Sequence, residues 1–211
     1  MKAATVRSGV IESTHEWSAV LFADSAVAQT WGDGHGQTVF ARSTIKPFQA
    51  TVAFELGAHL VAEHMAVACS SHSGTPAQLA IVDAMLHEAG LDATALQCPP
   101  ALPYGEGARH RWIAAGNGRT AMTHNCSGKH AAFLRACVSQ GWDIATYLEP
   151  DHPLQRAIIA RIAAVTGEYP YPLGVDGCGS PTPRVTLTGL ARSYATLSVD
   201  GEFERARTAM M

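Results

Sequence analysis

Apolar residues recur along this chain with two spacings, and each spacing predicts a different kind of element. Short apolar runs at residues 17–23 and 38–42 are typical of strands, and the turn-rich segment GDGHGQ lies between them. From residue 43 to residue 57 the apolar side chains instead recur at the spacing of one helix face, at Ile45, Phe48, Val52 and Leu56. The predicted helix must begin near Ser43, because Pro47 fits only a first helical turn.

The remainder of the chain continues this alternation. The apolar run MAVAC at residues 65–69 predicts a buried strand that leads into the polar turn SSHSGTP. Apolar spacing predicts three further helices, at residues 77–90, 129–138 and 151–165. The last of them should be capped by Asp151, with Pro153 in its opening turn. The glycine and proline cluster at residues 175–183 predicts turns, and two more helices follow it.

The composition limits the classes of protein to which the chain can belong. Its 211 residues are 47% hydrophobic, enough for the core of a single domain, residues 1–211, or of two closely packed lobes. A net charge of −3 without a basic stripe argues against nucleic-acid binding, and no apolar run reaches the roughly 18–20 residues of a membrane span. The N-terminal residues lack a secretory pattern, so we expect a cytoplasmic protein with its five cysteines reduced.

Two short runs place hydroxyl groups beside candidate bases or in turns. STIK, residues 43–46, is an S-x-x-K run on a first helical turn, where the Lys46 amine can reach the Ser43 hydroxyl. A desolvated lysine with a lowered pKa can accept the serine proton, as in serine–lysine acyl hydrolases. An N-cap serine beside a surface lysine has the same pattern. SSHSG, residues 70–74, either presents a catalytic hydroxyl or forms a hydrogen-bonded turn.

Two other runs, HNCSGKH (residues 124–130) and DGCG (residues 176–179), each carry a cysteine in a glycine-containing turn. Thiolates from Cys126 and Cys178 could bind one metal ion, and sulfur ligands favour zinc over magnesium or calcium. A disulfide between them, or two unrelated buried cysteines, would give the same pattern. Lys129 is one of only three lysines, against twelve arginines. Lysine, unlike arginine, can lose its proton when desolvated, so it can act as a base, a nucleophile or a ligand.

Taken in order, the segments ARSTIKPFQA, ACSSHSG, HNCSGKH and DGCGSP resemble those of the Rhizobium-type L-asparaginases, the asparaginase II family. The resemblance runs from about Val39 to Pro181, and four ordered motifs are far more specific than any one of them. It implies hydrolysis of L-asparagine to L-aspartate and ammonia. It also implies an α/β (α+β) fold, a mixed or antiparallel sheet flanked by helices, similar to the serine β-lactamase and glutaminase-like folds.

The resemblance assigns roles to the residues that match the family's motifs. Ser43 and Lys46 correspond to the S-x-x-K pair, and Ser71 corresponds to a second catalytic serine. The zinc-site and substrate-site residues that it implies are Cys126, Lys129 and Cys178 as ligands, Asp176 beside the ion, and Arg42 and His130 lining the site. This would explain why residue 129 is a lysine, since a neutral amine can bind a metal ion and a guanidinium in practice cannot.

The chain also departs from the family pattern. Family members are longer and use a later lysine as the partner of the second serine. No lysine follows Lys129, so Ser71 would lack its base. The ending EFERARTAMM still has a helical pattern, so we expect a C-terminally truncated chain whose exposed apolar surface favours a homodimer. Thr75 stands where an acidic residue is expected. The alternatives to asparagine hydrolysis are hydrolysis of glutamine or another small amide, and a catalytically inactive zinc-binding fragment.

Overall fold

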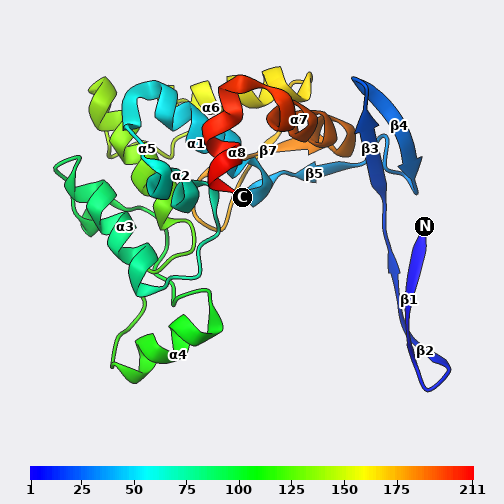
Figure 1. Ribbon diagram of the computed structural model, residues 1–211, viewed down its shortest axis with the longest axis horizontal. Helices are drawn as coiled ribbons and strands as arrows, with labels where there is room; N and C mark the ends of the chain where they lie inside the picture. The colour runs from blue at the N-terminus through cyan, green and yellow to red at the C-terminus, as the bar shows by residue number, and fades with distance from the viewer.

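The computed structural model describes residues 1–211 and shows a body of helices from which N-terminal hairpins extend (Figure 1). The α-helices are α1 (Lys46–Ala53), α2 (Ala62–Cys69), α3 (Pro76–His87), α4 (Glu106–Ala114), α5 (Ser127–Gln140), α6 (Pro153–Thr166), α7 (Leu187–Val199) and α8 (Glu204–Ala209). The strands are β1 (Lys2–Arg7), β2 (Val10–Glu16), β3 (Ala19–Ala23), β4 (Ala26–Trp31), β5 (Thr38–Phe40), β6 (Leu173–Val175) and β7 (Pro181–Thr186). Short turns of other helix types complete the fold: η1 (Arg42–Ile45), η2 (Phe54–Ala58), η3 (Ala93–Ala95) and η4 (Gly201–Phe203).

The strands form three small antiparallel sheets, ordered β1–β2, β3–β4 and β5–β7–β6. In the third sheet, Val39 pairs with Val185 and Leu173 pairs with Pro183. Helices flank this sheet, so the predicted α/β class with antiparallel strands is confirmed. The chain enters η1 and α1 directly from β5, which places residues 42–46 at the end of the sheet.

Helix α5 lies at the centre of the body and packs against α1, α2 and α3. Its buried face includes Phe133 and Leu134, both inaccessible to solvent. Gly128 in its first turn touches α2 so closely that an added Cβ would lie 2.8 Å from the carbonyl oxygen of Val67. A side chain at residue 128 would force the helices apart, so glycine permits the contact. This approach brings the N-terminus of α5 beside the loop that follows α2.

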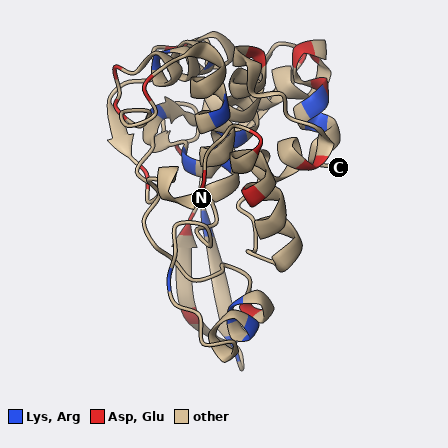
Figure 2. Cartoon of the chain, turned by 90° about the vertical axis from the view of Figure 1, so that its left-hand side faces the viewer, with Lys and Arg blue, Asp and Glu red and all other residues tan.

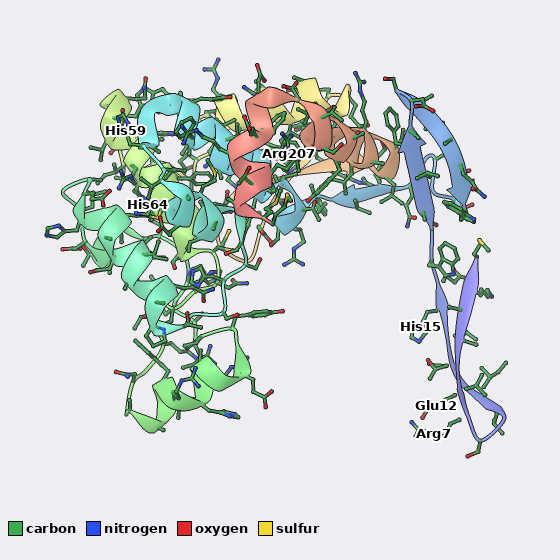
Figure 3. All side chains as sticks on the ribbon, in the orientation of Figure 1. Arg7, Glu12, His15, His59, His64 and Arg207 are labelled. Carbon is green, nitrogen blue, oxygen red and sulfur yellow. The ribbon has the colours of Figure 1, made fainter.

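The β1–β2 hairpin differs from the body because nearly all of its residues are exposed on both faces. Figure 3 shows Arg7, Glu12 and His15 toward the outer end of this hairpin, away from the helices. Arg7 and Glu12 form an ion pair of 2.9 Å next to its turn. A two-stranded hairpin alone is only marginally stable in water, and β1–β2 adds little buried surface. The second hairpin is attached more firmly, since β3 packs against α7.

The prediction of a strand at residues 65–69 was wrong. These residues form the second half of α2, which begins at Ala62, and Met65, Val67 and Ala68 are buried. A run of five consecutive apolar residues has no periodicity to distinguish a strand from a helix. The earlier residues Glu63 and His64 belong to the same helix, and the apolar run alone did not reveal them.

The predicted turns at residues 175–183 were only partly right. Residues 176–180 form the turn, but Pro181 and Pro183 lie in strand β7. A proline cannot donate a ladder hydrogen bond, yet its carbonyl can still accept one, and the backbone N–H of Ala41 donates to the Pro183 oxygen at 3.0 Å. Helix α6 also begins differently, because His152 and not Asp151 caps it, with Nδ1 accepting from the backbone N–H of Leu154.

Charged residues of both signs are interspersed on the face seen in Figure 2. This distribution agrees with the small net charge of −3. No helix is both long enough and apolar enough to cross a membrane.

Candidate active site

The S-x-x-K residues lie where β5 ends and the first helical turns begin. Ser43 belongs to the 3-10 turn η1 and Lys46 is the first residue of α1. Ser43 does not cap the helix, because Ala41 and Ile45 occupy the two N-cap positions. Lys46 is not a surface lysine either, since only 1% of it is exposed. The structure therefore excludes the reading of STIK as a capping serine beside a solvated lysine.

Lys46 is joined to both candidate serines by a short series of hydrogen bonds. Its Nζ donates to the backbone oxygen of Ser70 at 2.6 Å and to the Oγ of Ser71 at 3.0 Å. The Ser71 hydroxyl in turn donates to the Oγ of Ser43 at 3.3 Å. The Lys46 amine thus reaches Ser43 through Ser71 and not directly, as the helical spacing had suggested. Both hydroxyl-bearing residues are exposed, whereas the amine beneath them is buried.

The contact between Lys46 and Ser71 also changes the sequence-based expectation for Ser71. That serine was expected to lack a base, because no lysine follows residue 129. In the structure, the lysine of the S-x-x-K run lies within hydrogen-bonding distance of it. Burial is the main reason that the pKa of Lys46 falls below its ordinary value. A buried amine beside a hydroxyl has the arrangement needed to accept a proton from it.

The Ser71 loop is held against the start of α5 by the residue that follows it. The backbone N–H of His72 donates to the carbonyl of Asn125 at 3.1 Å, and its Nε2 bonds the Oγ of Ser127 at 2.9 Å. Ser127 donates its own proton to the carbonyl of Met122, so it accepts from His72. Burial lowers the pKa of His72 to about 4, which keeps the ring neutral at pH 7. The motif SSHSG contains His72, but the sequence alone did not indicate a role for this histidine.

The second cluster consists of Cys126, Lys129 and Cys178. Cys126 is the N-cap residue of α5, Lys129 follows on its first turn, and Cys178 lies in the turn before β7. The Nζ of Lys129 lies 3.2 Å from the sulfur of Cys178. The neighbouring Cys178 side chain lowers the pKa of Cys126 to about 6, and Cys126 in turn raises the pKa of Cys178. All five cysteines are free, so the disulfide alternative for this pair was wrong.

The chemistry of this donor set fits a soft metal ion. Two sulfur atoms and one amine converge from different segments, and thiolates are the ligands that zinc prefers among protein side chains. The structure contains no group of three or more histidine, cysteine or carboxylate side chains arranged for a metal ion, so the lysine nitrogen would have to serve as the third ligand. A neutral amine has a lone pair for this purpose.

The two clusters are parts of one site. Cys126, Lys129 and Cys178 all lie close enough to act electrostatically on the Lys46 amine, so the thiol pair lies beside the lysine of the serine cluster. The remaining predicted residues lie around these groups. Arg42 has a positive φ of 48° and its Nε donates to a carboxylate oxygen of Asp176 at 3.0 Å. A non-glycine residue in this conformation is uncommon and is typical of functional sites.

His130 occupies a different position from the substrate-lining one predicted for it. It is 0% exposed, with Nδ1 2.7 Å from the hydroxyl oxygen of Tyr147. Burial lowers the pKa of its imidazole to about 4. Tyr147 was missed from the sequence, because a single tyrosine in a loop between two helices carries no recognisable signal.

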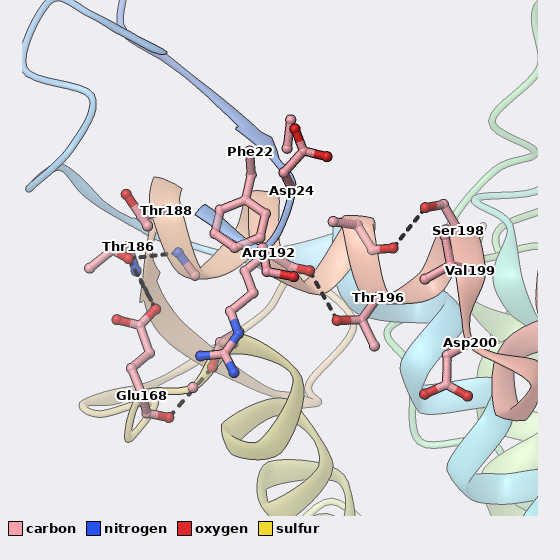
Figure 4. Close-up of a pocket in the computed structure, with 16 residues that line it drawn as sticks. Phe22, Asp24, Glu168, Thr186, Thr188, Arg192, Thr196, Ser198, Val199 and Asp200 are labelled. Atoms are coloured by element: carbon pink, nitrogen blue, oxygen red, sulfur yellow. Dashed lines mark hydrogen bonds between the residues drawn. The ribbon is translucent and has the colours of Figure 1, made fainter. Parts of the chain in front are cut away.

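A surface pocket lies away from the residues of the two clusters. It has a volume of about 970 Å³ between the β3–β4 hairpin and α7, and Figure 4 shows Phe22, Arg192 and Glu168 among its lining residues. Glu168 is already used there as an acceptor for the backbone N–H of Thr186 at 2.8 Å. The pocket contains no cysteine, histidine or lysine, and none of the predicted site residues lines it. Its size therefore does not make it the chemical centre of the protein.

The chain is similar to a known family over nearly its full length. The family model described as L-asparaginase II matches residues 3–211, which is nearly the whole chain and includes both clusters. No curated protein matches the chain. L-asparaginases are amidohydrolases that release ammonia from the side-chain amide of asparagine. The chain belongs to the L-asparaginase II family.

Proposed function

We propose that this chain hydrolyses L-asparagine to L-aspartate and ammonia by acyl transfer through Ser43, Lys46 and Ser71. The observation that carries the proposal is the series of hydrogen bonds that links the buried Lys46 amine to Ser71 and Ser71 to Ser43. Serine is a weak nucleophile until a neighbouring base takes its proton, and Lys46 is the base within reach. The exposed hydroxyls can meet a small substrate while the amine stays desolvated.

In the first half of the reaction, Ser43 Oγ attacks the carbon of the substrate's side-chain amide. The two hydroxyls first rotate so that Ser43 donates to Ser71 and Ser71 donates to the neutral Lys46 amine; the Ser43 proton then passes to Ser71 as Ser71 passes its own proton to Lys46. The tetrahedral intermediate then collapses, the C–N bond breaks, and the Lys46 ammonium returns a proton to the leaving nitrogen to give ammonia. Backbone N–H groups of the turn around the serine stabilise the oxyanion.

In the second half, water attacks the acyl ester on Ser43. Lys46 takes the proton of the water through Ser71, and the ester C–O bond breaks to release L-aspartate. The proton then returns to Ser43, and the enzyme is restored with no net change in its own protonation.

We also propose that Cys126, Lys129 and Cys178 hold a zinc ion, with Asp176 close to it. When bound, zinc supplies a fixed positive charge that positions the substrate, since two thiolates and an amine leave the ion little Lewis acidity. Asp176 keeps Arg42 at the edge of this site through their ion pair. Arg42 is exposed, and the guanidinium N–H groups that do not bond Asp176 can contact the α-carboxylate of asparagine.

The first experiment is to measure ammonia release from L-asparagine and L-glutamine by the purified chain, with zinc content determined on the same sample. Asparagine activity that disappears in Lys46→Ala supports the proposal. Faster ammonia release from glutamine would mean that the same mechanism acts with glutamine, and not asparagine, as the preferred substrate. Bound zinc without any ammonia release would mean that the chain binds the metal but is catalytically inactive, which would contradict the proposed activity.

A second experiment distinguishes the two serines. Ser43→Ala and Ser71→Ala should each be incubated with substrate and analysed by mass spectrometry for an acyl-enzyme. We expect the ester to form on Ser43 in the parent and to form there more slowly in Ser71→Ala. No ester should form in Ser43→Ala. An ester that persists in Ser43→Ala would make Ser71 the nucleophile. The predicted homodimer and cytoplasmic location stay predictions.

A further inference from the structure

The turn that carries Ser43 is exposed between two buried residues. Ala41 and Ile45 are each 2% exposed, whereas residues 42–44 are open to solvent. Arg42, directly before Ser43, has a left-handed φ of 48°, a conformation that the Cβ of a side chain disfavours. An exposed turn with an unfavourable backbone angle keeps one conformation only when contacts from elsewhere in the fold hold it. The contacts of residues 42–44 therefore decide where the Ser43 hydroxyl lies.

The first contact lies on the N-terminal side of Ser43. The backbone N–H of Arg42 donates to the Oγ1 of Thr182 at 3.0 Å. Thr182 belongs to β7, the middle strand of the β5–β7–β6 sheet, and is 4% exposed. One residue earlier, the N–H of Ala41 still bonds a backbone oxygen of β7, that of Pro183. A side-chain hydroxyl thus holds the chain at the point where it leaves the sheet.

The second contact lies on the C-terminal side of Ser43. The hydroxyl of Tyr194, on α7, donates to the backbone oxygen of Thr44 at 2.8 Å. The Tyr194 ring packs edge to face against Phe48 of α1, with centroids 6.0 Å apart, and Phe48 is 0% exposed. Thr44 also closes the turn locally, because its N–H and its hydroxyl both donate to the Ala41 carbonyl. The tyrosine ring is therefore anchored on α1 while its hydroxyl reaches the residue beside the serine.

Both contacts come from one continuous segment of the chain. Thr182 lies in β7 and Tyr194 lies in α7, which begins at Leu187 directly after that strand. They are 140 and 150 residues away in sequence from the residues that they bond. Together they hold the turn on either side of Ser43, whose Oγ lies 3.3 Å from that of Ser71. Reaction rates depend steeply on the placement of the reacting groups, so this support bears on catalysis.

We propose that Tyr194 and Thr182 are positioning residues for Ser43, which hold the backbone on either side of it so that its hydroxyl stays within reach of Ser71. Tyr194 acts through Thr44, and Thr182 acts through Arg42. In this role neither residue transfers a proton. The inference rests on the proposed function, because Ser43 needs this support only as the attacking nucleophile.

Tyr194 is tested by Tyr194→Phe, which keeps the ring on Phe48 and removes only the hydroxyl. We expect kcat for ammonia release to fall about tenfold with KM unchanged, since a displaced nucleophile slows the reaction without changing how the substrate binds. The pH dependence of kcat should keep its shape, because Lys46 remains the base. Tyr169→Phe, at an exposed tyrosine, is the matched control and should behave like the parent. A parent-like kcat or an altered pH profile in Tyr194→Phe would overturn the positioning role.

Thr182 is tested by two variants that separate its hydroxyl from its volume. Thr182→Val keeps the shape and loses Oγ1, whereas Thr182→Ser keeps the hydroxyl and loses the methyl group. We expect kcat to fall about tenfold in Thr182→Val and to be retained in Thr182→Ser, the reverse of what a packing role would give. KM should also rise in Thr182→Val, because Thr182 bonds Arg42, the proposed substrate contact. A parent-like Thr182→Val, or a larger loss in Thr182→Ser, would refute the role of the hydroxyl.

The reactivity of Ser43 separates failure of this inference from failure of the proposed function. A fluorophosphonate modifies an activated serine as the Oγ–P bond forms, the P–F bond breaks and the serine proton passes to its base. Mass spectrometry measures this rate at residue 43, which we expect to be about tenfold lower in Tyr194→Phe than in the parent.

Each outcome of the labelling decides one of the two proposals. Slower labelling in Tyr194→Phe, in a protein that releases no ammonia, would refute the asparagine hydrolysis and retain the positioning role. Equal labelling and equal kcat in parent and Tyr194→Phe would refute the positioning role and retain the hydrolysis. A parent in which Ser43 is not labelled at all would refute Ser43 as the activated serine, and the positioning role with it.

Discussion

The two buried lysines of this protein have the same side chain but opposite surroundings. The Lys46 amine is bonded to oxygen atoms, and the hydroxyls that it reaches are open to solvent. The Lys129 amine is bonded to a sulfur atom and lies 5.4 Å from the centre of the Phe133 ring, in the interior. Oxygen neighbours suit proton transfer, and sulfur neighbours suit a soft metal ion. Position in the fold, and not residue type, separates the two roles.

The comparison is tested most severely at Lys46. Replacing it with methionine keeps the volume but removes the base, so ammonia release should fall about a thousandfold, within the range typical of a lost general base. Zinc content should stay unchanged, because the thiol cluster is intact. Lys2→Met is the matched control, since Lys2 is an exposed lysine paired with Glu16 on β2. Loss of zinc in Lys46→Met would show that the two lysines do not act separately.

The second test changes Lys129 to arginine, which retains a positive charge but cannot act as a ligand. We expect zinc affinity to fall by more than about a hundredfold, since even the loss of an outer contact costs 10–100-fold. Lys2→Arg should have no effect. Equilibrium dialysis against zinc measures the affinity directly. Full zinc binding in Lys129→Arg would remove the lysine from the ligand set and leave the two cysteines to account for it.

His72 ties the two regions together, and its burial predicts a pH dependence of stability. Its pKa is lowered from 6.5 to about 4 chiefly by desolvation, so the unfolded chain takes up the proton first as pH falls. The stability contribution is full above pH 6.5 and is lost toward pH 4. At 1.36 kcal/mol per unit, this amounts to about 2–3 kcal/mol between pH 7.5 and pH 4.5.

Urea unfolding at these two pH values measures that loss. His72→Gln, which can still donate to Ser127 but does not titrate, should lose about 2–3 kcal/mol less than the parent between the two pH values. His15→Gln on the exposed β2 strand serves as the control and should behave like the parent. Identical pH dependence of the parent and His72→Gln would show that His72 does not stay neutral in the folded protein.

The smallest expected effect comes from the packing that brings the clusters together. Gly128→Ala places a methyl group against the Val67 carbonyl and should separate α5 from α2, at a cost of about 1–2 kcal/mol in unfolding free energy. Ammonia release should fall more than stability alone explains, because the start of α5 carries Cys126 and Lys129. Gly141→Ala, at the other end of α5, tests the helix without touching the site. Unchanged activity in a folded Gly128→Ala would show that the site tolerates the displacement.

Most helices of the body could be predicted from apolar spacing, including α1, α3, α5 and α6. Helix α2 could not, since its run of five consecutive apolar residues has no periodicity that distinguishes a helix from a strand. The hairpin strands β1, β2 and β4 were missed for the opposite reason, because strands exposed on both faces do not alternate apolar and polar residues. Helical spacing of the largest apolar side chains, as at Ile45, Phe48 and Val52, is what made α1 predictable although all of its residues are buried.

The sequence by itself determined which residue types could perform chemistry and in which order they occur: the serine–lysine pair, the second serine and the two cysteine turns. Only the tertiary structure decided that Lys46 bonds Ser71 before Ser43, that Cys126 lies beside both lysines, and that the Tyr147 hydroxyl lies beside His130. These contacts join residues far apart in the chain. Motif spacing defines neighbours along one turn of a helix, whereas the close packing of α5 against α2 defines neighbours across the site.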